Sequence, residues 1–418
     1  MKKAIFIATV GFVMATAQAQ AADIRVHYAI PTIWSDTQEK LAEVFMQKNP
    51  DIKVTIDGPA TSYADGVQRL LRESIAGNLP DVAYVGLNRW RALESRGITK
   101  PLDSFIGNPM DFEKAGYSPA LRSLGIYQGK QYALATSAST MVMYVNPDLV
   151  KRAGGSMENF PTTFDGIIKL AAKIDALGND VEGVWIGRHD WRFQGVLGSH
   201  GGRPLNGDES DVTFDSDAGV AAATIYSRFF KESGMPIYRQ NDARQAFPAG
   251  TLGIFFESSS LLNKFTEAAG KNFKVTVLPT PVVVKDKSKA YFPTGGSAIV
   301  MLTDDAEKQK AVWRYMLFVT GPEGAKIIVE NTGYAPTNTI VLSDDAYLGK
   351  FYASNPNARV AHAQVAAHAG PWYAYPGPEG VAVTDLIGAA LVLISEGDDP
   401  KATIKELAKT VRGKLKMK

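Results

Sequence analysis

Hydrophobic positions near the start of the chain follow two different periods. Three short apolar runs predict β-strands, at 24–28, 52–56 and 81–85. Between the strands, apolar residues recur with a helical spacing over 35–48 and 63–76, and Ser35 with Gln38 is expected to cap the first of these helices after a loop at 29–34. This β-α-β-α-β order predicts a mostly parallel sheet with helices on both faces.

Helical periodicity returns later in the chain and accounts for most of what remains. The predicted helices span 161–174, 218–230, 306–319, 322–330, 381–395 and 400–414. The polar segment 206–211 predicts a turn, followed by a short strand at 212–214. Because 418 residues exceed what one ordinary core fills, the expected class is α/β with two domains.

The first 22 residues read as a secretory signal peptide. Lys2 and Lys3 precede an apolar stretch, residues 4–14, that is too short to span a bilayer, and small residues at cleavage spacing follow at 17–21. The mature protein is therefore expected in the periplasm. The chain has no cysteine, so disulfides and cysteine metal sites are excluded.

Charge and motif content exclude several functional classes. Without Lys2 and Lys3 the chain has 43 basic and 43 acidic residues, and no basic stripe predicts binding to nucleic acid or to an anionic membrane. The five histidines are not in a zinc-site spacing, and Ser258-Ser259-Ser260 does not fit a nucleophile elbow. Thr294-Gly295-Gly296-Ser297 lacks the lysine of a phosphate-binding loop. No cofactor, metal or catalytic residue is predicted.

The loops that follow the first three strands each contain an aromatic residue: Trp34, Tyr63 and Trp90. In parallel sheets ligands bind beyond the carboxyl ends of the strands, so these aromatic residues are candidates for the lining of a cleft. Packing in a core is the alternative for each of them.

Several segments, taken in order, resemble the extracellular solute-binding proteins of ABC importers, family 1, which include the maltose- and glycerol-3-phosphate-binding proteins. The segments include AFPAGTLGIFFESSSLLNKF at 246–265, FKVTVLPTP at 273–281 and KAVWRYMLFVTGPEGAKIIVENTGYAPT at 310–337. The resemblance implies a two-lobe fold of the periplasmic binding protein type that closes on its ligand by hinge bending.

The same resemblance implies three hinge crossings between the lobes. They are expected near 135–139, 277–281 and 332–336. The N-terminal lobe would comprise 23–137 and 282–332, and the C-terminal lobe 138–281 and 333–418.

Family members line their site with an aromatic residue, hydroxyl groups, a glycine pair and a tyrosine. By motif match these positions are Tyr63, Ser139, Ser258, Gly295, Gly296 and Tyr334. A helix cap is the alternative for Ser258. The glycine pair is expected to offer amide donors and bare backbone to the ligand, so that Gly296→Val would block binding and leave the fold intact.

The charge of the ligand is left open by the sequence. Asn88 stands where glycerol-3-phosphate binders carry an acidic residue, and residues 371–383 lack their late arginine, which argues against a glycerol-3-phosphate specialist. Arg188 and Arg192 could hold an anionic group if they face the cleft, or be solvated charges on the surface. Trp372 and Tyr375 would add an aromatic platform suited also to a neutral glycoside.

The predicted function is the solute-binding component of an ABC importer for a carbohydrate or polyol derivative, such as a glycoside, with or without a phosphate or sulfonate group. Its partners would be the sugar-type ligand and the membrane permease subunits, and the protein would act as a monomer. An exported glycoside or phosphoester hydrolase, or a chemoreceptor, is the alternative. The candidate ligand contacts are Trp34, Tyr63, Asn88, Ser139, Arg188, Trp191, Arg192, Ser258, Gly295, Gly296, Ser297, Tyr334, Trp372 and Tyr375.

Overall fold

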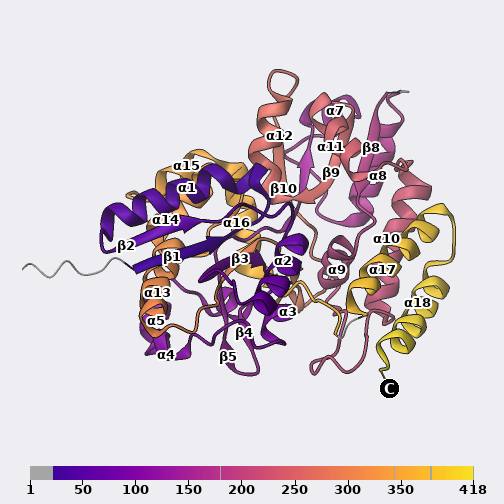
Figure 1. The fold of residues 1–418 in the computed structure, drawn as a ribbon. Coiled ribbons are helices and arrows are strands. Elements are labelled where there is room, and N and C mark those ends of the chain that lie inside the picture. The colour runs from indigo at the N-terminus through magenta and orange to yellow at the C-terminus, as the bar shows by residue number, and fades with distance from the viewer. Residues whose placement is uncertain (1–21, 179, 343, 377–378, 418) are drawn as a thin grey trace, which may run out of the picture.

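The chain folds into two lobes that lie side by side, each built around its own sheet (Figure 1). The computed structural model describes residues 22–178, 180–342, 344–376 and 379–417. The predicted signal peptide, residues 1–22, therefore lies outside the described residues except for Ala22, the first residue of β1.

The sheet of the first lobe has the order β2-β1-β3-β12-β6. Its strands are β1 (Ala22–His27), β2 (Ile52–Ile56), β3 (Val82–Gly86), β12 (Ser297–Met301) and β6 (Ala133–Ala135). The parallel pairing predicted for β1, β2 and β3 is confirmed. The last two strands are paired in antiparallel fashion. Strand β12 enters from a distant part of the chain and runs antiparallel to both β3 and the edge strand β6. Every residue of β3 and β12 is buried, as expected for strands with helices on both faces.

Helix α1 (Pro31–Lys48) begins earlier than the sequence indicates. Its N-cap is Ile30, in the left-handed region at φ 60°, and the proline at the first turn loses no helical hydrogen bond there. The predicted loop at 29–34 and the capping pair Ser35 and Gln38 are therefore wrong. Ser35 instead shares a 2.9 Å hydrogen bond with the hydroxyl of Tyr28.

The other helices of the first lobe cover this sheet or lie beside it. They are α2 (Tyr63–Ala76), α3 (Arg91–Glu94), α4 (Asp103–Ile106), α5 (Pro109–Lys114), α6 (Pro119–Ser123), α13 (Ala306–Thr320), α14 (Pro322–Asn331) and α15 (Gly349–Ser354), with the 3-10 turn η3 (Ile340–Leu342). A small hairpin joins β4 (Ile126–Tyr127) and β5 (Lys130–Gln131).

The sheet of the second lobe has the order β10-β7-β9-β8 and is largely antiparallel. Its strands are β7 (Met141–Val145), β8 (Glu182–Ile186), β9 (Leu252–Ser258) and β10 (Thr276–Pro279). A two-stranded pair joins β11 (Phe292–Pro293) to β13 (Ala369–Gly370). The strand predicted at 212–214 is wrong, since only one isolated bridge forms there, between Leu205 and Val212.

Helices of the second lobe enclose the largest hydrophobic core of the described residues, which extends from Met141 to Val411. They are α7 (Pro147–Arg152), α8 (Phe164–Asp175), α9 (Asp190–Ser199), α10 (Asp217–Ser233), α11 (Gln240–Ala249), α12 (Leu262–Ala269), α16 (Pro356–His368), α17 (Gly380–Glu396) and α18 (Pro400–Leu415), with the 3-10 turns η1 (Ser259–Leu261) and η2 (Lys287–Lys289). Within the described ranges, no helix combines the length and apolar character that crossing a membrane requires.

Three chain segments run next to one another where the lobes join. Isolated bridges pair Ala138 with Ala335 and Ser139 with Gly295. The first segment connects β6 to β7 at the place the sequence indicates. The second differs from the expected 277–281, because β10 pairs with β7 and the chain stays on the second lobe until β11.

Contacts with α9 explain the late second crossing. The backbone N–H of Val283 donates to the carbonyl of Ser199, and that of Tyr291 donates to the carbonyl of Gly198. After the third segment the chain returns to the first lobe, where η3 and α15 pack on α14, before α16 packs against β10. Residues 282–293 thus lie with the second lobe and 340–354 with the first, unlike the boundaries expected from sequence.

Candidate functional site

The two lobes meet at the loops that follow β3 and β8 and at the three crossing segments. Arg91, just after β3, forms an ion pair with Glu209 of the second lobe, with N–O distances of 2.8 and 3.1 Å. Tyr334 of the third crossing lies near Ser260, which follows β9. Loops at strand ends from both lobes therefore face one another, which is where α/β proteins bind small molecules.

Trp34, Tyr63 and Tyr334 form an aromatic cluster on the first-lobe side. The indole N–H of Trp34 donates to the Tyr63 hydroxyl at 3.1 Å, and the rings of Trp34 and Tyr334 stack with centroids 5.7 Å apart. Trp34 is only 1% exposed, so it supports the two tyrosines from behind. Burial raises the pKa of the Tyr63 hydroxyl well above its usual value, which keeps this hydroxyl neutral and able to donate.

Ser297 lies beneath this cluster and is fully buried. Its hydroxyl shares hydrogen bonds with Thr136 at 2.6 Å and with Ser137 at 3.0 Å, both in the first crossing segment. A hydrogen bond between Ser297 and the Tyr63 hydroxyl lowers the pKa of Tyr63, against the larger effect of burial. Ser297 therefore ties the first crossing to Tyr63, a role that spacing in the sequence cannot reveal.

Ser258 and Ser260 bring hydroxyl groups from the second lobe. The Ser258 oxygen accepts from the backbone N–H of Ser260 at 3.3 Å, so the cap interpretation is confirmed for Ser258. The two hydroxyls also share a 2.9 Å hydrogen bond. Ser260 was not singled out from the sequence, although its serine neighbours were, and its contact with Tyr334 links the hydroxyl groups of the two lobes.

The first glycine of the pair does not offer its amide donor as the sequence indicates. The N–H of Gly295 donates to the carbonyl of Ser139 at 2.9 Å, so this donor is already used. Gly296 has φ 118°, and a Cβ there would lie 2.2 Å from the carbonyl oxygen of Ser137. The expectation that Gly296→Val leaves the fold intact is therefore wrong, because only glycine fits this close approach.

Arg192 is neither a free cleft cation nor a solvated one. It is 3% exposed and pairs at 2.5 Å with Glu257, which is also buried and is held by Arg244 at 3.1 Å. Burial alone would raise the pKa of Glu257, but Arg192 and Arg244 outweigh it and hold that pKa below its usual value. The pair joins α9, which follows β8, to the end of β9, and it positions both of them.

Arg188 is directed toward α11 and the end of α17. Its Nη2 donates to the carbonyl of Tyr238 at 3.2 Å. Burial lowers the pKa of the Arg188 guanidinium, and the charge of Glu396 partly offsets this. Arg192 is therefore not available to clamp an anion, whereas Nη1 of Arg188 is buried without a partner among the described residues, so an anion contact by Arg188 stays a prediction.

Asp190 organises the second aromatic group. Its carboxylate accepts hydrogen bonds from the Trp372 indole at 3.0 Å, from Gln194 at 3.0 and 3.1 Å, and from the Tyr375 hydroxyl at 3.4 Å. The group is fully buried without a cation beside it, and burial raises its pKa to about 6. Trp372 remains partly exposed, whereas Tyr375 is buried behind it.

The remaining candidates lie close to the crossings or to the turn after β3. The indole N–H of Trp191 donates to the carbonyl of Pro293 at 3.0 Å, and a Cβ on Gly295 would lie 3.7 Å from its ring. Asn88 is half-buried beside the Cα of Gly86, which also faces Tyr63. Trp90 instead donates to the carbonyl of Leu124 inside the first lobe, so it packs in the core.

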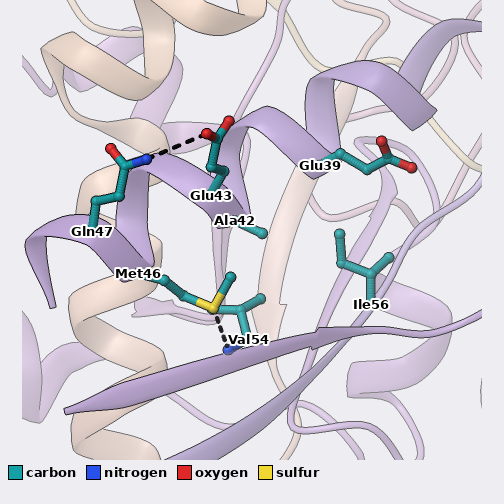
Figure 2. A pocket seen from close by; sticks show the side chains of 7 residues that line it. All are labelled: Glu39, Ala42, Glu43, Met46, Gln47, Val54 and Ile56. Carbon is teal, nitrogen blue, oxygen red and sulfur yellow. Dashed lines mark hydrogen bonds between the residues drawn. The ribbon is translucent and has the colours of Figure 1, made fainter. Parts of the chain in front are cut away.

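An open groove lies elsewhere, between α1 and the edge strand β2 (Figure 2). Glu39, Glu43 and Gln47 border it, and Met46, Val54 and Ile56 supply apolar surface. None of the residues predicted for the site lines this groove. The convergence of side chains from both lobes favours the interlobe cleft as the functional site.

Comparison with known proteins relates this chain to solute-binding proteins. Residues 40–360 match the family model described as bacterial extracellular solute-binding protein. A putative binding protein of Brucella abortus is 26% identical over 385 residues, with 88% of this chain and 87% of the relative covered. The sn-glycerol-3-phosphate-binding periplasmic protein UgpB of Escherichia coli K12 is 25% identical over 344 residues, which cover 78% and 76% of the two chains.

Solved structures share the two-lobe fold over nearly the whole chain. UgpB from Mycobacterium tuberculosis in complex with glycerophosphocholine has a TM-score of 0.81 at 22% identity and covers 95% of this chain and 99% of its own. The sugar-binding protein MalE from Xanthomonas citri has a TM-score of 0.81 at 16% identity, with 94% and 98% covered. At these identities the likeness establishes the fold.

Proposed function

Because the chain belongs to the bacterial extracellular solute-binding proteins, we propose that it is the periplasmic binding component of an ABC importer for a carbohydrate or polyol derivative. Proteins of this family bind solutes, and the proposal includes no catalytic step. The relatives named above carry names for glycerophosphate and sugar ligands, which share several hydroxyl groups on a small carbon frame.

The observation that carries the proposal is the meeting of hydroxyl and aromatic groups from both lobes at the cleft. Tyr63 and Tyr334 come from the first lobe, and Ser258 and Ser260 come from the second. Each hydroxyl can both donate and accept, which suits a ligand with several hydroxyl groups. Trp372 adds a partly exposed ring for the apolar face of a sugar.

We assign direct contact with the ligand to six of the candidates. These are Tyr63, Asn88, Ser258, Trp191, Trp372 and the hydroxyl of Tyr334. The other candidates position these residues. Trp34 packs against the tyrosines, and Arg192 and Tyr375 hold the loops of the second lobe. The crossing segments are shaped by Ser139, Gly295, Gly296 and Ser297.

Closure would couple binding to transport. A ligand held by groups of both lobes favours the closed form by the difference between its affinities for the closed and open forms. The membrane permease would then recognise the closed protein, which acts as a monomer in this proposal. The three crossing segments, bridged at Ala138–Ala335 and Ser139–Gly295, are the place for the bending.

Calorimetric titration of the purified mature protein tests the proposal. The panel contains sugars, glycosides, polyols and their phosphate or sulfonate derivatives, and thermal unfolding with each compound provides a second readout. Binding of at least one member, weakened by Tyr63→Ala but not by Glu43→Ala in the outer groove, supports the cleft. Binding that Glu43→Ala removes and Tyr63→Ala spares would contradict it.

A further inference from the structure

Four arginines stand at or near the cleft, and three of them have partners. Arg91 pairs with Glu209, and Arg192 pairs with Glu257. Arg188 has a single hydrogen bond, from Nη2 to the carbonyl of Tyr238, and its Nη1 is buried without a partner among the described residues. Arg89 differs, because its guanidinium makes no hydrogen bond or ion pair with any residue of the described ranges. Its backbone alone is engaged, with the N–H donating to the carbonyl of Gly86 at 2.8 Å.

The turn that contains Arg89 lies where the lobes meet, since Arg91, two residues later, pairs with Glu209 of the second lobe. Arg89 lies in the turn that follows β3, next to Asn88, and the Cα of Gly86 in the same turn faces Tyr63. The positive charge of Arg89 is one of the charges that lower the pKa of His189, which lies on the opposite lobe.

The surroundings of Arg89 supply no counter-charge. The side chain is half-buried, and burial lowers the pKa of its guanidinium with no carboxylate acting against that shift. A partly desolvated cation without a partner is unfavourable. Such a position is therefore expected where an anion joins the cation in the ligand-bound protein. A ligand that enters the cleft can supply the missing anion.

His189 faces this position as a neutral group. The residue is exposed, and partial desolvation of its ring, with help from Arg192, lowers the pKa of its imidazole. Its Nδ1 accepts from the backbone N–H of Trp191 at 3.1 Å, which leaves Nε2 as the protonated nitrogen, and its ring meets Trp372 edge to face at 6.2 Å. The imidazole adds a hydrogen-bond donor opposite Arg89 without adding a second charge.

We infer that Arg89 binds an anionic oxygen group of the ligand, so that the cleft takes a polyol or sugar derivative with a phosphate, sulfonate or carboxylate group. The planar guanidinium fork matches the paired oxygens of these groups. The inference deepens the proposed function and rests on it. It adds a position for the anion on the other lobe, whereas the sequence offered Arg188 and Arg192 as candidates.

Calorimetric titration of matched neutral and anionic compounds tests the inference. The probes are glycerol, glycerol 3-phosphate and glycerophosphocholine, and glucose with its 6-phosphate, its 6-sulfonate and glucuronate. The wild-type protein is compared with Arg89→Gln, with Arg89→Lys, and with Arg96→Gln, which removes an exposed arginine of the same lobe.

The expected result is that the wild-type protein binds at least one anionic probe more tightly than its neutral counterpart. Arg89→Gln should weaken that binding by about tenfold or more, and Arg96→Gln should not change it. Arg89→Lys should recover part of the loss, since it restores the charge but not the fork. The phosphate, sulfonate and carboxylate probes then identify which anion is preferred.

Two results would overturn the inference. Equal affinity of wild-type protein and Arg89→Gln for the anionic probe would leave Arg89 without this role. A wild-type protein that binds only neutral probes would refute the anionic ligand and leave the proposed function standing. Binding to no probe would count against both, and thermal unfolding of each variant shows whether the fold is retained.

Discussion

Arg91 and Glu209 join the two lobes by a pair of parallel hydrogen bonds, from Nη1 at 2.8 Å and from Nη2 at 3.1 Å. The guanidinium also lies over the ring of Tyr127, 4.3 Å from its centroid. Both charged side chains are about one-third exposed or less. The structure therefore has a charged contact between the two lobes.

Removal of this contact should favour the open form. Arg91→Ala or Glu209→Gln is expected to cost the closed form up to about 1 kcal/mol, because a partly exposed pair is screened by solvent. Small-angle scattering of the ligand-free protein should show a larger radius of gyration in either variant. The difference should shrink at high salt, where the wild-type pair is weakened as well.

The swapped variant Arg91→Glu with Glu209→Arg is the control, since it restores the pair in reverse. Its compaction should approach that of the wild-type protein. Equal compaction of all four proteins at low salt would show that the contact has no part in closure.

The buried pair of Arg192 and Glu257 should be needed for stability. Arg192→Met leaves a buried carboxylate with a single half-exposed cation, Arg244, and two neutral donors, Gln240 and the backbone N–H of Ser258. Loss of one member of a buried pair typically costs about 3–5 kcal/mol. Urea unfolding should show this loss of free energy of unfolding. The control is Arg228→Met, which removes an arginine from an exposed pair with Glu232 and should cost about 1 kcal/mol or less. Similar losses in the two variants would contradict the assignment.

Asp190 predicts a specific dependence of stability on pH. Burial raises its pKa to about 6 from an ordinary value of about 3.8. The folded state thus binds this proton more tightly than the unfolded state. The contribution favours folding at low pH and is lost as pH rises from about 4 to about 6.

Comparison with Asp190→Asn isolates this contribution. Urea unfolding at pH 4 and pH 7 gives the free energy of unfolding of both proteins. The wild-type protein should lose more stability than the variant over this interval, by up to about 3 kcal/mol. A pH dependence that is the same in both proteins would mean that Asp190 titrates normally.

The glycine pair predicts two different outcomes for the same substitution. Gly296→Ala places a Cβ 2.2 Å from a backbone carbonyl at a φ of 118°, so it should destabilise the fold itself. Gly295→Ala meets the Ser139 hydroxyl at 2.7 Å, which can rotate away, so the fold should be retained. Thermal unfolding distinguishes the two. A Gly296→Ala protein with wild-type stability would show that the crossing can relax there.

Local pattern in the sequence was enough to predict most helices and strands. The helical period located α2 and α13 closely, because each has a clear apolar face and a side-chain cap, Ser62 and Asp305. It failed at the start of α1, where Ile30 adopts a left-handed conformation that no local signal indicates. Strand order and the antiparallel entry of β12 depend on pairing between distant segments.

The candidate site could be predicted only in part, for the same reason. Tyr63 and Tyr334 follow from motif resemblance, and the structure brings them together. The partners of Arg192 and Asp190 come from β9 and from the segment before α17, far away in the sequence. Whether an arginine near the cleft is free or paired is therefore decided by tertiary contacts, and Arg89 had no distinguishing signal.

Solution scattering with and without a bound ligand tests the central claim, that ligand held by both lobes closes the cleft, most directly. A compound from the binding panel should reduce the radius of gyration of the wild-type protein, and Tyr63→Ala with Ser258→Ala should abolish the change at the same ligand concentration. A ligand that binds tightly without any compaction, or that compacts the double variant equally, would contradict binding between the lobes.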